Sequence, residues 1–115
     1  MNRLEEIKAA IDYVEANLTG ELEIEEIAAK AYLSKASFQK TFALLCGFTV
    51  GEYIRNRRLS EAGNDLLATS AKVIDIALKY GYDSPEGFTK AFTRFHGATP
   101  NAVTWVPKPP EALPS

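Results

Sequence analysis

A stretch of 16 residues recurs in this chain at an offset of 50 residues, and this repeat constrains the fold more than any other feature. Residues 34–49 and 84–99 share their hydrophobic spacing, and Leu45 aligns with Phe95. The identical pairs are Ser34/Ser84, Phe38/Phe88, Lys40/Lys90, Phe42/Phe92, Gly47/Gly97 and Thr49/Thr99. Internal repetition indicates copies of one supersecondary unit. Each copy predicts a short helix, a turn and a second helix with a polar outer face.

The composition fits a small globular protein without disulfides. A chain of 115 residues with 46% hydrophobic residues can form one domain or two small lobes. The lone Cys46 excludes an intrachain disulfide, and we interpret it as a small buried residue rather than a nucleophile. No apolar run is long enough to span a membrane and no signal-peptide pattern follows Met1, so we expect a cytoplasmic protein.

The charge is unevenly distributed along the chain. Its net value of −2 argues mildly against a nucleic-acid partner. However, residues 1–33 hold three basic and eight acidic residues, whereas residues 34–115 hold ten basic and seven acidic residues. The basic charge therefore gathers in the repeats and between them, which fits either an ordinary solvated surface or a nucleic-acid-binding surface.

Two helices are predicted before the first repeat. Residues Leu4 to Leu18 place hydrophobic side chains at 3-4-3-4 spacing, which is typical of one face of an amphipathic helix, and Gly20 ends it. The second helix covers about residues 24–32, with two glutamates in its first turn.

The first repeat supplies the third helix. Ser34 is a suitable N-cap, and Gly47 can end the helix in a left-handed conformation. Residues 31–34 are then the tight turn of a helix-turn-helix. Three side chains are expected to face the core, namely Phe38, Phe42 and Leu45.

A long helix is predicted between the repeats. Thr49 and Glu52 have the spacing of a capping box, and the helical pattern continues to about Ala68. Some 20 residues at 1.5 Å each give a length of roughly 30 Å. Gly63 within it predicts close packing. The helix carries Arg55, Arg57 and Arg58, which either pair with Glu61 and Asp65 or contact phosphate or a neighbouring lobe.

The second unit follows the same plan. A helix is expected over about residues 73–80, and residues 81–83 form the turn. The sequence Ser84-Pro85-Glu86 is a strong helix start, and Gly97 ends that helix. A short last helix runs from Thr99-Pro100 to about Trp105, before a proline-rich tail. The side chains expected to face the core are Ile74, Ala77, Leu78, Phe88, Phe92 and Phe95.

The sequence contains no catalytic constellation, so we expect no enzyme, no metal site and no cofactor. One histidine, His96, and one cysteine cannot form a zinc site. We interpret His96 as a helix C-terminal residue that interacts with the helix dipole. No phosphate-binding glycine motif is present.

A helix-turn-helix places its second helix in the major groove of DNA. In the first copy the outward candidates for base contacts are Ala36, Gln39 and Lys40; a glutamine can form a bidentate pair with adenine. In the second copy they are Pro85, Glu86, Thr89 and Lys90. Since Pro85 offers no side-chain hydrogen bond and Glu86 would repel phosphate, we expect the first copy to select bases and the second mostly to grip the backbone.

Further polar and basic residues are candidates for phosphate contacts. They are Ser34, Lys35, Ser37, Arg55, Arg57, Ser84 and Arg94. The predicted linker helix is nearly as long as one turn of B-DNA, about 34 Å. A single chain can therefore set two recognition helices into successive major grooves.

These residues resemble the DNA-binding domain of AraC/XylS-type bacterial transcription regulators over about residues 4–105. The strongest part is Ile76-Ala77, Gly81-Tyr82, Ser84, Phe88-x-Lys90-x-Phe92 and Gly97-x-Thr99-Pro100. The segment from Tyr53 to Leu67 resembles the linker helix of the family. The resemblance implies an all-α, homeodomain-like fold of seven helices, with two helix-turn-helix subdomains joined by a long linker helix.

The resemblance also implies a function and a domain organisation. We expect binding to double-stranded promoter DNA, activation or repression of transcription, and contact with RNA polymerase. Residues 1–48 and 70–106 are the expected subdomains, 49–69 the linker helix, and 107–115 a tail or a connection to a C-terminal ligand-sensing domain. The alternative is a protein-interaction module with little specific DNA readout, favoured by the acidic first 33 residues and the weak second recognition helix.

Overall fold

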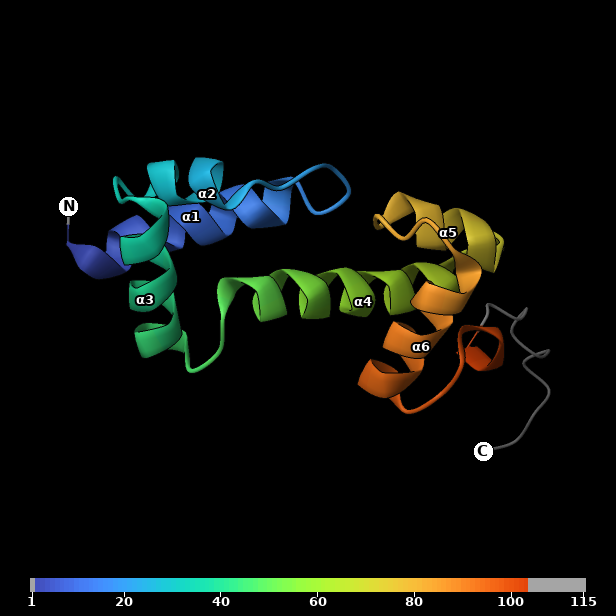
Figure 1. Ribbon diagram of the computed structural model, residues 1–115. Helices are drawn as coiled ribbons and strands as arrows, with labels where there is room; N and C mark the ends of the chain where they lie inside the picture. The colour runs from blue at the N-terminus through green and yellow to red at the C-terminus, as the bar shows by residue number, and fades with distance from the viewer. Residues whose placement is uncertain (1, 104–115) are drawn as a thin grey trace, which may run out of the picture. The chain divides into compact units, whose positions relative to one another are not determined.

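The computed structural model describes residues 2–103, and every regular element in this range is helical (Figure 1). The all-α prediction is therefore confirmed. The expected seventh helix is a four-residue 3₁₀ helix, and Trp105 and the proline-rich tail lie outside the described residues. The elements are α1 (Arg3–Ala16), α2 (Ile24–Lys30), α3 (Lys35–Cys46), α4 (Val50–Ala68), α5 (Val73–Lys79), α6 (Pro85–His96) and η1 (Pro100–Val103).

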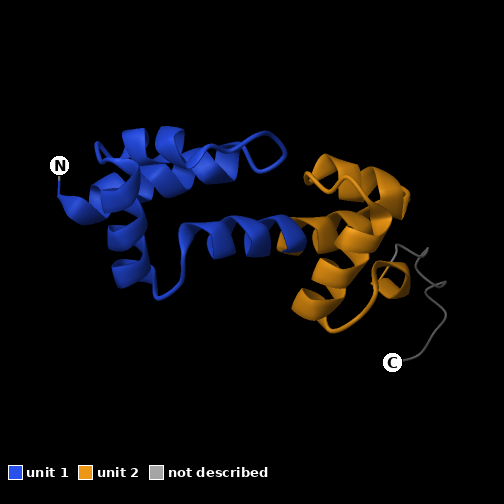
Figure 2. Ribbon diagram, viewed as in Figure 1, with its two compact units in different colours: residues 1–59 blue, residues 60–115 orange. Residues whose placement is uncertain are grey.

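The chain divides into two compact units, of which the first ends at Leu59 and the second begins at Ser60 (Figure 2). The boundary falls inside α4, so each unit includes part of that helix. In the first unit α1 packs on α2 and α2 packs on α3; in the second α5 packs on α6 and α6 packs on η1. Within the described range no helix has the length and apolar character needed to cross a membrane.

The predicted helix caps are present. The Ser34 hydroxyl accepts a hydrogen bond from the Ser37 amide at 3.2 Å, and the Ser84 hydroxyl accepts one from the Gly87 amide at 3.1 Å. Such caps satisfy amides that the first turn of a helix leaves without a partner. The closing glycines of α3 and α6 adopt φ values of 82° and 79°, a left-handed conformation that glycine adopts without strain.

The capping box at the start of α4 is also present. The Glu52 amide donates to Thr49 Oγ1 at 3.0 Å, and the Thr49 amide donates to Glu52 Oε1 at 2.8 Å. These reciprocal bonds fix the first residues of α4 and let the chain turn sharply after α3.

The core of the first unit is built around Phe38 and Phe42, which are both fully buried. The Phe42 ring lies against three aromatic rings, with centroid distances of 5.7 Å to Phe38, 6.0 Å to Phe48 and 5.8 Å to Tyr53. Such aromatic contacts add to the free energy gained from burial. The buried residues of this core are Ile7, Ala10, Val14, Leu18, Ile27, Ala28, Ala31, Phe38, Phe42, Val50 and Ile54.

The core of the second unit is built around Phe88 and Phe92, whose ring centroids are 5.4 Å apart. The His96 ring lies on Phe92 at 4.2 Å, and a Cβ atom at Gly63 would come within 2.9 Å of His96 Cε1. The close contact expected at Gly63 is therefore present, and His96 is one side of it. The other buried hydrophobic residues of this unit are Ala62, Leu66, Ile76, Ala77 and Tyr80.

Five hydrophobic side chains that the sequence pattern placed in the core are exposed instead. Leu45 and Phe95 lie in the last turns of α3 and α6, where the next residue rather than these two continues the packing: Cys46 packs against the core and the His96 ring lies on Phe92. Since α5 is only seven residues long, Ile76 and Ala77 occupy its buried stripe. The five exposed fractions are 68% for Leu4, 49% for Leu45, 38% for Ile74, 57% for Leu78 and 41% for Phe95.

Candidate nucleic-acid interface

Helix α3 exposes polar side chains over its first two turns. Because Phe38 and Phe42 point into the core, the positions between them point outward. The structure brings Ala36, Gln39 and Lys40, the three predicted base-contact residues, together on this exposed face. The side chains of Gln39 and Lys40 make no hydrogen bond or ion pair within residues 2–103, so their polar groups are available to a partner.

The N-terminus of α3 is less free. The Ser34 hydroxyl accepts the capping hydrogen bond from the Ser37 amide, which leaves its own O–H group to donate to a phosphate. Lys35 is exposed, and its Nζ atom lies 3.7 Å from a carboxylate oxygen of Glu25 on α2. A loose, solvent-exposed ion pair of this kind contributes little to stability, but it places a negative charge beside a residue predicted to contact phosphate.

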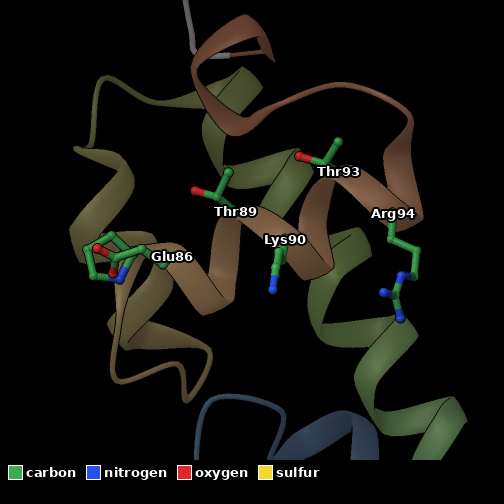
Figure 3. A pocket seen from close by; sticks show the side chains of 6 residues that line it. Glu86, Thr89, Lys90, Thr93 and Arg94 are labelled. Carbon is green, nitrogen blue, oxygen red and sulfur yellow. The ribbon is translucent and has the colours of Figure 1, made fainter.

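Helix α6 presents a corresponding face with a different chemistry. Pro85, Glu86 and Lys90 are exposed and Thr89 is partly buried. Six residues of α6 line a shallow concavity, and Figure 3 shows their side chains along this helix. They are Pro85, Glu86, Thr89, Lys90, Thr93 and Arg94. The structure therefore groups all four predicted base-contact residues of the second copy with the predicted phosphate contact Arg94.

Two features distinguish this second face from that of α3. The first turn of α6 contains an acidic residue, Glu86, whereas the first turn of α3 contains none. The Thr93 hydroxyl is buried and lacks a hydrogen-bond partner within the described residues. The donors that remain at the surface are Thr89, Lys90 and Arg94, of which only the last two are charged.

The three arginines of α4 differ in their surroundings. Arg55 is exposed. Arg57 donates two hydrogen bonds to the Glu15 carboxylate, from Nε at 2.8 Å and from Nη2 at 2.9 Å. Arg58 donates to the carbonyl oxygens of Leu18 and Gly20, both at 2.8 Å. Arg57 and Arg58 therefore fasten the first part of α4 to the α1 region of the same unit.

The ion pairs along α4 include partners that the local pattern does not indicate. Arg57 pairs with Glu15, and Asp65, which the sequence offered as one possible partner of the arginines, instead accepts hydrogen bonds from Lys79 and Tyr80, each at 2.7 Å. Glu15 lies 42 residues before Arg57, so no local pattern could identify it. The guanidinium of Arg57 is therefore engaged by a carboxylate rather than presented to a phosphate.

The contacts among Glu15, Tyr53 and Arg57 shift the pKa values of Glu15 and Tyr53. The hydrogen bond from Arg57 is the largest cause that lowers the pKa of Glu15, with help from Tyr53, against an opposing effect of burial. Burial and the bond to Glu15 raise the pKa of Tyr53 to about 12. Tyr53 therefore keeps its proton and donates it to Glu15 at 2.6 Å. These shifts belong to a structural ion pair rather than to a catalytic site.

Within the described range, no three His, Cys, Asp or Glu side chains gather closely enough to hold a metal ion. Cys46 is partly buried, and burial raises the pKa of its thiol, so it is a poor nucleophile. The polar faces of α3 and α6 are therefore the best-supported functional surfaces of this part of the chain.

Comparison with known proteins gives matches of sequence and fold. A helix-turn-helix domain family matches residues 27–104. The chain is similar to the HTH-type transcriptional activator AarP of Providencia stuartii, with 40% identity over 95 residues that cover 83% of this chain and 70% of AarP. It is also similar to the DNA-binding domain of AdpA, solved in complex with a target DNA, with 26% identity, a TM-score of 0.73 and 89% of each chain covered.

A further solved structure supports the fold. An AraC-type regulator from Chromobacterium violaceum superimposes with a TM-score of 0.82, at 24% identity, over 87% of this chain and 89% of that chain. At this identity the likeness concerns the arrangement of helices alone. It agrees with the element order described above.

Proposed function

Because the chain belongs to the AraC/XylS family of helix-turn-helix transcription regulators, we propose that it binds promoter DNA through two recognition helices, α3 and α6. Members of this family are sequence-specific DNA-binding regulators and not enzymes. The observation that carries the proposal is the exposed face of α3, where Gln39 and Lys40 alternate with the buried Phe38 and Phe42. An uncommitted polar face on a rigid, capped helix can enter a major groove without rearrangement.

Helix α3 is the main base-reading element in this proposal. Gln39 donates and accepts at the edge of an adenine, and Lys40 contacts a guanine or a nearby phosphate. Ala36 contacts the methyl group of a thymine. In α6, Thr89 and Lys90 take the places of Gln39 and Lys40, while Pro85 and Glu86 border the concavity.

The phosphate contacts surround these faces. They fix the register of the protein on the duplex and do not select a sequence. Lys35, Arg55 and Arg94 supply charge, and their side chains are exposed. The serines contribute hydroxyl and amide groups at the helix starts. These serines are Ser34, Ser37 and Ser84.

We further propose that the two recognition helices occupy successive major grooves. The 19 residues of α4 span about 28 Å at 1.5 Å per residue. This length is close to the repeat of the major groove on one face of B-DNA, about 34 Å. A duplicated helix-turn-helix would then do within one chain what many such proteins do as dimers.

Selection from a randomised duplex library, followed by anisotropy titrations at two salt concentrations, tests the proposal. We expect a consensus of two short blocks about one helical turn apart, and tight, salt-dependent binding of the selected duplex relative to a scrambled one. Gln39→Ala should lower the affinity for the selected duplex and relax the preference at one position. Equal weak binding to both duplexes would instead favour a protein-interaction module.

The name of AarP describes that relative as a transcriptional activator. We propose the same direction of regulation here, through contact with RNA polymerase, in the cytoplasm of a bacterium and at the nucleoid when bound to DNA. A reporter whose promoter carries the selected site should be expressed more strongly when the chain is present. Lower expression would assign the chain to repression instead.

A further inference from the structure

The two helix-turn-helix turns close with the same hydrogen bonds. At the end of α2 the Tyr32 amide donates to Ala29 O and the Leu33 amide donates to Ala28 O, both at 3.1 Å. At the end of α5 the Gly81 amide donates to Leu78 O at 3.1 Å and the Tyr82 amide donates to Ala77 O at 2.9 Å. This pair of bonds is the Schellman motif, whose central residue adopts a left-handed conformation.

The residue in that left-handed position differs between the units. In the second unit it is Gly81, with φ of 88°. In the first it is Tyr32, with φ of 58°, and among the described residues other than glycine it alone has positive φ. A side chain with a Cβ atom is strained in this conformation, and a bulky one is rarely found there. The first unit therefore has a tyrosine at a position where, in the second unit, a glycine closes the same turn without strain.

The side chain of Tyr32 makes no stabilising contact with the described residues that would offset this strain. It is 74% exposed, and it makes no hydrogen bond, ion pair or ring contact with another described residue. Its neighbour Leu33, by contrast, packs against the core of the first unit. Strained residues that the fold itself does not require concentrate at functional sites.

The position of Tyr32 indicates what it contacts. It lies two residues before Ser34, the N-cap of α3, and three before Lys35. The N-terminal part of a recognition helix is the part that approaches DNA, and polar groups around it contact phosphates. A phenol hydroxyl is a neutral donor on a rigid ring, and it can donate to a phosphate oxygen without a charge of its own.

We propose that Tyr32 contacts the DNA backbone, with its hydroxyl donating a hydrogen bond to a phosphate beside the groove that α3 occupies. This inference rests on the proposed function. Tyr32 is not among the contact residues that the sequence pattern predicted. A phosphate contact strengthens binding to every duplex without selecting a base.

Anisotropy titrations and urea unfolding of the intact chain and its Tyr32→Phe and Tyr32→Gly variants test the proposal. Tyr32→Phe keeps the ring and removes the hydroxyl, so the Kd should rise about three- to tenfold for the selected and the scrambled duplex alike. Tyr32→Gly should weaken binding at least as much while making the chain more resistant to urea, because it relieves the strain. Opposite changes in stability and affinity are the expected result.

Tyr13→Phe is the matched control, since Tyr13 lies on α1 of the same unit, with its ring beneath the Lys30 ammonium group at 4.8 Å. It should leave the Kd unchanged. Unchanged Kd values for both Tyr32 variants would overturn the inference, even where Gln39→Ala still lowers the affinity for the selected duplex. Failure of the parent chain to prefer any duplex would reject the proposed function itself.

Discussion

The two units of this chain share a scaffold and differ in the surfaces built on it. Both have a serine-capped recognition helix, a buried pair of phenylalanines four residues apart and a left-handed glycine at the helix end. The outer faces have diverged: α3 shows Gln39 and Lys40 with no acid in its first turn, while α6 begins with Pro85 and Glu86. Packing constrains only the inner positions of each recognition helix. The residues at the outer positions can therefore differ between the two units and serve different functions.

The largest expected effects test the shared scaffold. Phe42→Ala and Phe92→Ala should each lower the free energy of unfolding by about 3–5 kcal/mol, because each removes a fully buried ring and leaves a cavity. Phe42 should cost more, since three aromatic rings surround it. Urea unfolding of both variants measures the difference. Phe95→Ala, at an exposed position, is the control, and equal losses for all three variants would contradict a duplicated core.

The next largest effects test the divergence of the outer faces. Gln39→Ala should weaken binding to the selected duplex by about 1–3 kcal/mol, the cost of losing a bidentate base contact. Thr89→Ala should cost less than about 1 kcal/mol, since a single hydroxyl offers only one weaker contact. Both side chains project from recognition helices, so urea unfolding should barely change. An equal or larger loss of affinity for Thr89→Ala would make α6 a base-reading helix of the same rank.

The sequence alone predicted the scaffold well because its signals are local. Caps, closing glycines and the pattern of Phe38 and Phe42 depend on residues within four positions of one another, and the structure confirms them. The exposure of Leu45 and Phe95 could not be predicted, because elements that lie elsewhere in the sequence decide which side of the last helical turn they cover. Glu15 was missed because its partners Tyr53 and Arg57 follow 38 and 42 residues later.

Tyr32 illustrates a different limit. The turn was predicted at residues 31–34, but the backbone conformation of each turn residue depends on the hydrogen bonds that close it. At the offset of 50 residues that aligns the repeats, Tyr32 falls opposite Tyr82, and Gly81 falls opposite Ala31. Only the observed hydrogen bonds and φ values show that Tyr32 and Gly81 hold equivalent places in their turns.

Two carboxylates that link α4 to other segments, Glu15 in the first unit and Asp65 in the second, allow the pH dependence of stability to be compared. The hydrogen bond from Arg57 lowers the pKa of Glu15. Burial acts to raise the pKa of Asp65, but its bonds from Lys79 and Tyr80 outweigh this effect and lower it. Because both folded-state pKa values lie below their unfolded values, each group stabilises the fold above its unfolded pKa and ceases to do so as the pH falls through the folded one.

Urea unfolding at pH 7 and pH 3 should therefore separate Glu15→Gln from Asp65→Asn. Glu15 accepts three hydrogen bonds that link α1 to α4, so Glu15→Gln should cost about 1–2 kcal/mol at pH 7 and less at pH 3. Asp65→Asn should cost less at pH 7, since Asp65 accepts two side-chain bonds. A cost for Glu15→Gln that does not diminish in acid would show that its ionisation contributes nothing.

The smallest expected effect concerns the lysine at the start of α3, Lys35, which faces a carboxylate of α2. The Glu25 carboxylate lies 3.7 Å from the Lys35 ammonium group. In the second unit the corresponding residues are Asp75 and Pro85, so Asp75 has no lysine at that place to pair with. Glu25→Gln should free Lys35 for a phosphate and lower the Kd for any duplex about twofold, or roughly 0.4 kcal/mol. Asp75→Asn removes the same charge, and its Kd should stay closer to that of the parent chain. The gain should fade at high salt, because the pair is exposed and screened. Equal gains from both variants would show that net charge, rather than the Glu25–Lys35 pair, sets the effect.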